Sequence, residues 1–299
     1  MNLKDAVANA KGHKMTNYRL AAMRAPLLLA GEFAHAQEAA PDEDRRVDHD
    51  TVSKASEDDI AKESENPIGN LTVLPFENYT NFDVGPNRGT QNILEFEPVV
   101  PIHLNQDWNL INRAVIPVVW NPDLSPFPSV PQAFAPTDYS AFLSPRNLSG
   151  GWTVGAGPIV QLPTATSPTV GSSVWGLGPT AVVVHTSAHI VAGLLVNQVW
   201  SLGGVDSGPG GKRYATFLAE PFANYNFGGG WFVSSAPIIT DNQTHAGRKW
   251  TLPVGAVAGR IIKLGGKLPV KFSLGAYYNV VTPQYGAKWQ IQSVVAVIF

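Results

Sequence analysis

The chain has 299 residues, a formal net charge of -2, 44% hydrophobic and 15% charged residues, and no cysteine. These values exclude a charge-rich disordered chain, and they give no support for nucleic-acid binding, which calls for a basic patch or stripe. The absence of cysteine excludes a disulfide framework and a thiolate metal site, and no stretch approaches the roughly 18 consecutive apolar residues of a membrane-spanning helix.

The first 36 residues predict an upstream extension followed by a secretory signal peptide. A basic leader over residues 15–24 precedes an apolar run over 25–30, and Ala34 and Ala36 match the small-x-small cleavage pattern. We therefore expect cleavage after Ala36 and export from the cytoplasm. Glu32 interrupts the apolar region, so a soluble amphipathic segment is the alternative.

Residues 37–66 are rich in Asp and Glu and contain almost no large apolar residue. This composition predicts a flexible periplasmic arm. A short helix from Glu57 to Glu65 is compatible with it, because Ser56 stands where an N-cap would, acidic residues fill the first turn, and Pro67 ends it. A solvated linker is the favoured interpretation of these residues, and the short helix is the alternative.

From residue 67 onward, strand-like segments with alternating polarity are separated by turns. Side chains on a strand alternate between its two faces, so each segment predicts one apolar face and one more polar face. In residues 289–299, for example, Trp289, Ile291 and Val295 share a face opposite Gln290 and Gln292. The twelve predicted segments are 70–82, 90–103, 107–121, 137–147, 151–163, 173–186, 189–202, 213–227, 230–240, 248–263, 269–281 and 287–299. In the first, fourth and ninth segments the alternation does not decide which face is apolar.

The connections between these segments alternate in length. The odd ones are long and turn-rich (83–89, 121–136, 164–172, 203–212, 241–247 and 282–286), whereas the even ones are tight. Short periplasmic turns that alternate with longer outer loops are typical of outer-membrane β-barrels, and a soluble sandwich has no reason to alternate in this way. The fold class predicted is therefore all-β: a transmembrane, antiparallel, up-and-down barrel of about twelve strands over residues 67–299.

Tryptophans mark the predicted strand ends. Amphipathic rings gather at membrane interfaces, where the ring body contacts acyl chains and the N–H reaches the headgroups. We expect an interface girdle that consists of Trp108, Trp120, Trp152, Trp175, Trp200, Trp231, Trp250 and Trp289. The chain closes on the aromatic residue Phe299, which resembles the terminal signal by which bacterial outer-membrane barrels are recognised for assembly.

Several runs resemble landmarks of a known family. These are residues 66–71 and 75–86, residues 155–158 with 161–166, and residues 276–281. They are similar to the outer-membrane barrel family named after the meta-cleavage phenol-degradation pathway, whose bacterial members are often labelled transporter or neuromedin-U-like. The resemblance covers residues 66–299, and it implies an outer-membrane barrel that carries small aromatic or apolar compounds.

The polar faces of the predicted strands contain charged residues that would line the lumen. The candidates are Glu95, Glu97, Arg113, Glu220, Asn224 and Lys271. A tight turn at residues 105–106 would place Glu97 directly opposite Arg113, an arrangement that contributes about 0.2–1 kcal/mol in a sheet. Two interpretations stay open: a constriction that sorts solutes by charge and size, and a polar ladder that holds the barrel together.

Catalysis is the weaker alternative. A predicted turn separates His185 from His189, and two ligands fall short of the three that a catalytic zinc site uses. The serines do not form a Gly-x-Ser-x-Gly elbow. We therefore expect no catalytic residue, no metal site and no cofactor.

The sequence thus predicts a monomeric passive channel in the outer membrane of a Gram-negative bacterium. Its expected partners are the lipid bilayer, the barrel-assembly machinery and small-molecule solutes. The alternatives are a lipid-modifying enzyme and a structural barrel that is plugged by the 121–136 loop or by the acidic arm.

Overall fold

The computed structural model describes residues 55–299 except 127–129, 206–210, 245–246 and 248. The predicted signal peptide and the first part of the acidic arm, up to residue 54, lie outside the described residues. The elements are α2 (Glu57–Ser64), β1 (Val73–Val84), β2 (Gly89–Phe96), β3 (Val99–His103), β4 (Trp108–Trp120), β5 (Gln132–Phe134), β6 (Thr137–Pro145), β7 (Trp152–Leu162), β8 (Gly176–Thr186), β9 (Ile190–Ser201), β10 (Ala215–Gly228), β11 (Trp231–Ser235), β12 (Ile239–Asn242), β13 (Trp250–Leu264), β14 (Leu268–Val281) and β15 (Trp289–Ile298).

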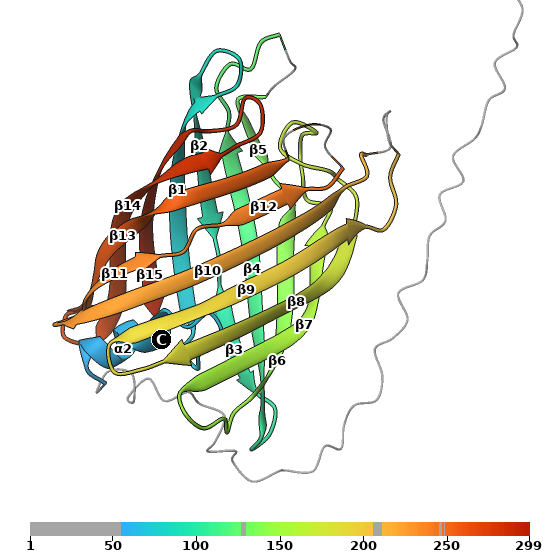
Figure 1. Ribbon diagram of the computed structural model, residues 1–299. Coiled ribbons are helices and arrows are strands. Elements are labelled where there is room, and N and C mark those ends of the chain that lie inside the picture. Colours follow the sequence, from blue (N-terminus) through green and yellow to red (C-terminus); the bar gives the residue numbers. More distant parts are fainter. Residues whose placement is uncertain (1–54, 127–129, 206–210, 245–246, 248) are drawn as a thin grey trace, which may run out of the picture. The chain divides into compact units, whose positions relative to one another are not determined.

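The fifteen strand segments form twelve antiparallel strands of one closed barrel (Figure 1). Three strands are interrupted: β2 and β3 both pair with β4, β5 and β6 both pair with β4, and β11 and β12 both pair with β10. Each interruption contains a proline, Pro98, Pro136 or Pro237, which has no amide hydrogen to donate to a neighbouring strand. The predicted twelve-stranded antiparallel barrel is confirmed.

The barrel closes between its first and last strands. β1 pairs with β15 from Val73↔Ile298 to Phe82↔Trp289. The ladder extends one residue further, because the amides of Thr72 and Phe299 each donate to the carbonyl oxygen of the other, at 3.1 and 2.8 Å. No sheet edge is left open at this seam.

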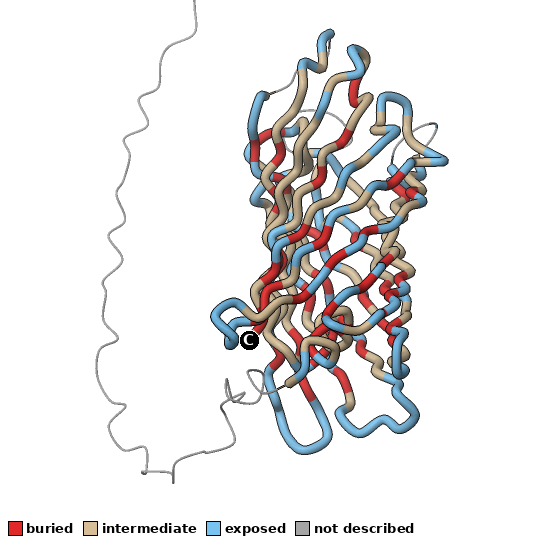
Figure 2. The backbone as a smooth tube through the Cα atoms, turned by 90° about the vertical axis from the view of Figure 1, so that its left-hand side faces the viewer, coloured by how far each residue is buried: buried red, intermediate tan, exposed pale blue. Residues whose placement is uncertain are grey.

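Exposed and buried residues alternate along the strands, as Figure 2 shows. In β15, Trp289, Ile291 and Val295 are exposed, whereas Ala296 and Ile298 are buried. The exposed parity faces outward and is apolar, and the other parity faces inward. The predicted faces of the last strand are confirmed.

β1 carries polar side chains on both faces. On its outer face, Asn78 and Thr80 hydrogen-bond to Asn92 of β2, with distances of 2.8 to 3.0 Å. These mutual bonds satisfy polar groups in the middle of an otherwise apolar wall. They also explain why alternation alone leaves the faces of this strand ambiguous.

The connections follow the predicted alternation with one exception. Strands are joined by short turns at one end, such as residues 229–230 and 265–267, and by longer loops at the other, such as 163–175 and 202–214. The first odd connection is shorter than predicted, because β1 continues to Val84 and only residues 85–88 form the turn. We call the two ends of the barrel the short-turn end and the loop end.

The tryptophans lie at or beside strand ends. Trp108, Trp152 and Trp231 are at the short-turn end, and the others are at the loop end. Most are well exposed on the outer face, with Trp231 and Trp289 each 52% exposed. This placement fits the predicted girdle, which remains a proposal.

The helix α2 has only eight residues, and the described part of the chain contains no helix with the length and hydropathy of a membrane span.

Candidate functional site in the barrel lumen

The end of the acidic arm forms α2, which packs against the inner wall of the barrel. The hydroxyl oxygen of Ser56 accepts a hydrogen bond from the Asp59 amide and caps the helix, as predicted. Ile60 and Ala61 are buried in a cluster that also contains the inward-facing Phe232 and Ile261. The short helix, which was the alternative to a solvated linker, is therefore present, and it is packed against the barrel rather than solvated.

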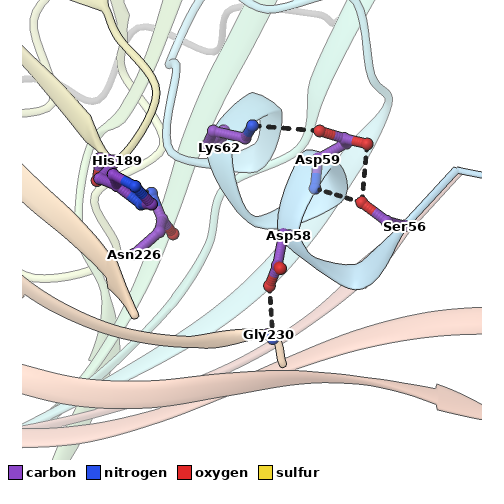
Figure 3. A network of polar contacts seen from close by, with 7 residues as sticks. All are labelled: Ser56, Asp58, Asp59, Lys62, His189, Asn226 and Gly230. Atoms are coloured by element: carbon purple, nitrogen blue, oxygen red, sulfur yellow. Dashed lines mark hydrogen bonds and ion pairs between the residues drawn. The ribbon is translucent and has the colours of Figure 1, made fainter. Parts of the chain in front are cut away.

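Polar contacts hold α2 in this position (Figure 3). The carboxylate of Asp58 accepts a hydrogen bond from the amide of Gly230, in the turn between β10 and β11, at 2.8 Å. Within the helix, the pKa of Asp59 lies below its ordinary value because the Ser56 hydroxyl and the Lys62 ammonium donate to its carboxylate. The helix is thus anchored at the short-turn end.

The chain then crosses to the opposite wall. Ile68 is 2% exposed and belongs to an inward-facing cluster with residues such as Ile111 of β4, Phe142 of β6 and Leu195 of β9. Asn70 accepts a hydrogen bond from Asn109 at 2.9 Å. Residues 55–72, which we call the crossing segment, therefore occupy the short-turn end of the lumen.

The predicted pair of Arg113 and Glu97 forms, although the predicted register is wrong. A guanidinium nitrogen of Arg113 lies 2.8 Å from a Glu97 carboxylate oxygen. In the ladder, however, Arg113 is opposite Val99 rather than Glu97. The turn is centred nearer residue 106, and the long Arg113 side chain reaches diagonally across the sheet.

Lys271 is neutralised by a partner that the sequence did not indicate. Its ammonium lies 2.5 Å from a carboxylate oxygen of Glu65, in the crossing segment, and 5.2 Å from the centre of the Phe232 ring. The ion pair satisfies the Glu65 oxygen, which has no other hydrogen bond. The sequence contains one indication of this ion pair: Lys271 lies on the inner face of a largely apolar strand, where a buried ammonium group needs an anionic partner.

A second polar cluster was missed because it spans the barrel seam. The carboxylate of Glu77 accepts hydrogen bonds from the Tyr79 hydroxyl at 2.6 Å and from the Gln292 amide at 3.0 Å. The sequence places Gln292 on the polar face of the last strand. Its contact with Glu77 depends on how β1 and β15 are aligned.

An internal cavity of about 160 Å³ brings most of these groups together. It lies between the crossing segment and the barrel wall. Its polar lining consists of Ser64, Glu65, Asn66, Glu77, Tyr79, Glu97, Arg113, Glu220, Ser234, Lys271, Ser273, Tyr277 and Gln292.

Two of the predicted lumen residues do not line this cavity. Glu95 faces inward on β2 but does not line it. Asn224 faces inward on β10 and is 2% exposed, with no hydrogen-bond partner for its side-chain amide. The cavity thus contains four of the six candidates and excludes these two.

The histidines within the described residues are scattered. The His185 ring lies against the Trp152 ring, with centroids 4.7 Å apart, and the His189 ring lies 6.0 Å from that of Tyr225. No three His, Asp or Glu side chains in the described part of the chain converge as metal ligands.

No family model matches this sequence. No curated protein matches it either. The family predicted from the sequence landmarks therefore stays a prediction.

Three solved structures are similar to this chain to different degrees. An outer membrane channel from Pseudomonas putida F1 is similar with a TM-score of 0.58 and 17% identity, over 77% of this chain and 94% of that chain. NanC porin has a TM-score of 0.47 and 10% identity over 76% and 98% of the two chains. The CymD monoaromatic hydrocarbon channel has a TM-score of 0.39 and 13% identity over 76% and 87%. The likeness to the Pseudomonas protein shows that this chain has the fold of an outer-membrane β-barrel.

Proposed function

We propose that this protein is a passive channel for small solutes in the outer membrane of a Gram-negative bacterium. The observation that carries the proposal is the opposite polarity of the two faces of the barrel wall. The outer face is apolar and bounded by tryptophans, whereas the inner face carries charged and amide side chains around a cavity. A wall of this kind suits a barrel with lipid outside and water inside.

Passage would be diffusion past the polar groups of the lumen, with no covalent step. The crossing segment narrows the short-turn end, so only small solutes are expected to pass. The family resemblance adds small aromatic and apolar compounds as the class of solute to test first.

Liposome swelling tests this function directly. Vesicles that contain the purified chain are expected to swell in neutral, charged and small aromatic solutes, with rates that fall steeply as solute size increases. Empty vesicles provide the background rate. Swelling that does not exceed this background for any solute would refute the channel.

A plugged barrel is the second candidate, and one observation favours it. Ile68, Ile60 and Ala61, all from the crossing segment, are almost completely buried against the inner wall. A barrel filled in this way would give no swelling and no single-channel current in planar bilayers. A phospholipid hydrolysis assay on the same vesicles tests the lipid-modifying alternative.

A further inference from the structure

The lumen cavity has more carboxyl groups than cations. Its lining contains four acidic residues (Glu65, Glu77, Glu97 and Glu220) and two basic residues (Arg113 and Lys271). Each basic side chain already lies in an ion pair, Arg113 with Glu97 at 2.8 Å and Lys271 with Glu65 at 2.5 Å. Among the described residues, Glu77 and Glu220 therefore form no direct ion pair, although the charges of Lys271 and Arg113 act on them from a greater distance.

The two remaining carboxyl groups differ in their surroundings. Glu77 accepts hydrogen bonds from Tyr79 and Gln292, and both bonds reach the same carboxylate oxygen. Glu220 also lines the cavity, and its carboxylate has no hydrogen-bond or ion-pair partner among the described residues. A cation in the cavity could pair with Glu220 and with the second oxygen of Glu77.

An unpartnered hydroxyl group independently points to a ligand. Ser273 is 8% exposed, lines the cavity, and its hydroxyl has no hydrogen-bond partner. A buried polar group in this condition costs about 1–3 kcal/mol. A ligand with a hydrogen-bond donor would remove that cost.

The cavity also has aromatic walls of a suitable size. Phe222, Phe232 and Tyr277 line it, and the faces of aromatic rings attract cations. Its volume of about 160 Å³ is close to the roughly 150 Å³ of an engineered cavity that holds benzene. The site therefore suits a compact organic molecule rather than an extended one.

We propose that the cavity selects small organic cations, in which an ammonium group is attached to an apolar or aromatic body. Glu220 and Glu77 pair with the ammonium, the Ser273 hydroxyl accepts one of its hydrogen bonds, and the aromatic walls contact the body. The passage of the ligand rests on the proposed channel function, whereas the binding of the ligand does not. A divalent metal ion fits less well, because no three carboxylate or histidine side chains converge among the residues described.

Three solutes with one ring and different charge test the selectivity. Benzylammonium, neutral benzyl alcohol and anionic benzoate are compared in the liposome swelling assay. Benzylammonium is expected to pass fastest and benzoate slowest, and planar bilayers under a KCl gradient are expected to show a preference for K⁺ over Cl⁻. Equal rates for the three solutes, or a preference for benzoate, would overturn the selectivity.

Calorimetry on the detergent-solubilised full chain tests binding separately. Benzylammonium is expected to bind to the wild type. Glu220→Gln is expected to weaken this binding by about tenfold or more, because the variant loses one hydrogen bond between charged groups. Ser273→Ala removes only a hydroxyl group and is expected to weaken benzylammonium binding several-fold. This variant tests the site if Glu220→Gln does not fold. Asp107→Asn, in an exposed turn between β3 and β4, removes one carboxylate outside the cavity and is the matched control.

The two methods distinguish the two proposals. Binding of benzylammonium without swelling in any solute would refute the channel and retain the cation site. Swelling without charge preference, together with equal binding by the wild type and Glu220→Gln, would retain the channel and refute the cation site.

Discussion

The basic side chains of the lumen form ion pairs with carboxylates from other parts of the chain. Arg113 and Glu97 are both largely buried, with 18% and 10% of their side chains exposed. Removing one member of such a pair leaves the other charge without compensation, which costs more than the pair itself contributes. This pair therefore tests whether the lumen charges hold the barrel together or filter solutes.

We expect Arg113→Ala to lower the free energy of unfolding by about 3–5 kcal/mol, because Glu97 loses its partner. Urea unfolding of the protein in lipid vesicles measures the change. The double variant Arg113→Ala/Glu97→Ala should recover part of the loss. If the single variant unfolds at the wild-type urea concentration while its ion selectivity changes, the pair is a filter and not a structural contact.

At the scale of one element, α2 depends on charge and on its cap. The acidic first turn faces the positive end of the helix dipole, and Ser56 bonds to both the amide and the carboxylate of Asp59. Because the pKa of Asp59 is lowered in the folded chain, the ionised carboxylate contributes its full stabilisation of the helix at pH values above the ordinary pKa of this group. It is lost as the pH falls through the lowered pKa.

Ser56→Ala is therefore expected to raise the pKa of Asp59 toward its ordinary value of 3.8 and to cost the helix about 1 kcal/mol. Carboxyl-carbon NMR titration in detergent micelles measures the pKa, and proteolysis of the arm reports on the helix. Ser56→Thr keeps the hydroxyl and should leave the pKa low. An unchanged pKa in the alanine variant would mean that Lys62 alone is responsible.

The sequence predicts the inner and outer faces of some strands better than those of others, because the two faces of a strand differ in polarity to different degrees. The faces of β15 were predictable because one parity is apolar and the other begins with Gln290 and Gln292. Those of β1 were not, because Asn78, Thr80 and Asn92 satisfy each other on the outer wall. Alternation is informative only where the two faces differ in polarity.

The candidate site was predictable only in part, for a related reason. Glu97 and Arg113 lie on adjacent strands joined by a short turn, so their proximity followed from the local pattern even though the register was shifted. Glu77 and Gln292, by contrast, are separated by 215 positions and meet only through closure of the barrel. The contact of Glu65 with Lys271 likewise depends on where the crossing segment lies, which no local pattern indicates.

At the scale of the whole molecule, the barrel presents one apolar surface outward. Leu274, in the middle of β14, is 62% exposed, and Leu268, at its short-turn end, is 38% exposed. In water such a surface would favour aggregation, whereas in a bilayer it contacts acyl chains. The depth of each side chain in the bilayer then determines the cost of a charge at that position.

Leu274→Arg is expected to reduce the free energy of unfolding in lipid vesicles by about 2–4 kcal/mol, because the charge would lie near the bilayer midplane. Leu268→Arg, near the interface, should cost only about 0–1 kcal/mol. Urea unfolding of both variants measures the difference. Equal costs at the two positions would contradict a lipid-facing wall.

The seam between Thr72 and Phe299 has a consequence for biogenesis. β15 follows all the other strands in the chain, so the edge of β1 that faces away from β2 has no partner until β15 has been made. A nonsense mutation anywhere before β15 would leave a permanently exposed edge, which proteases could recognise as a marker of unfinished product.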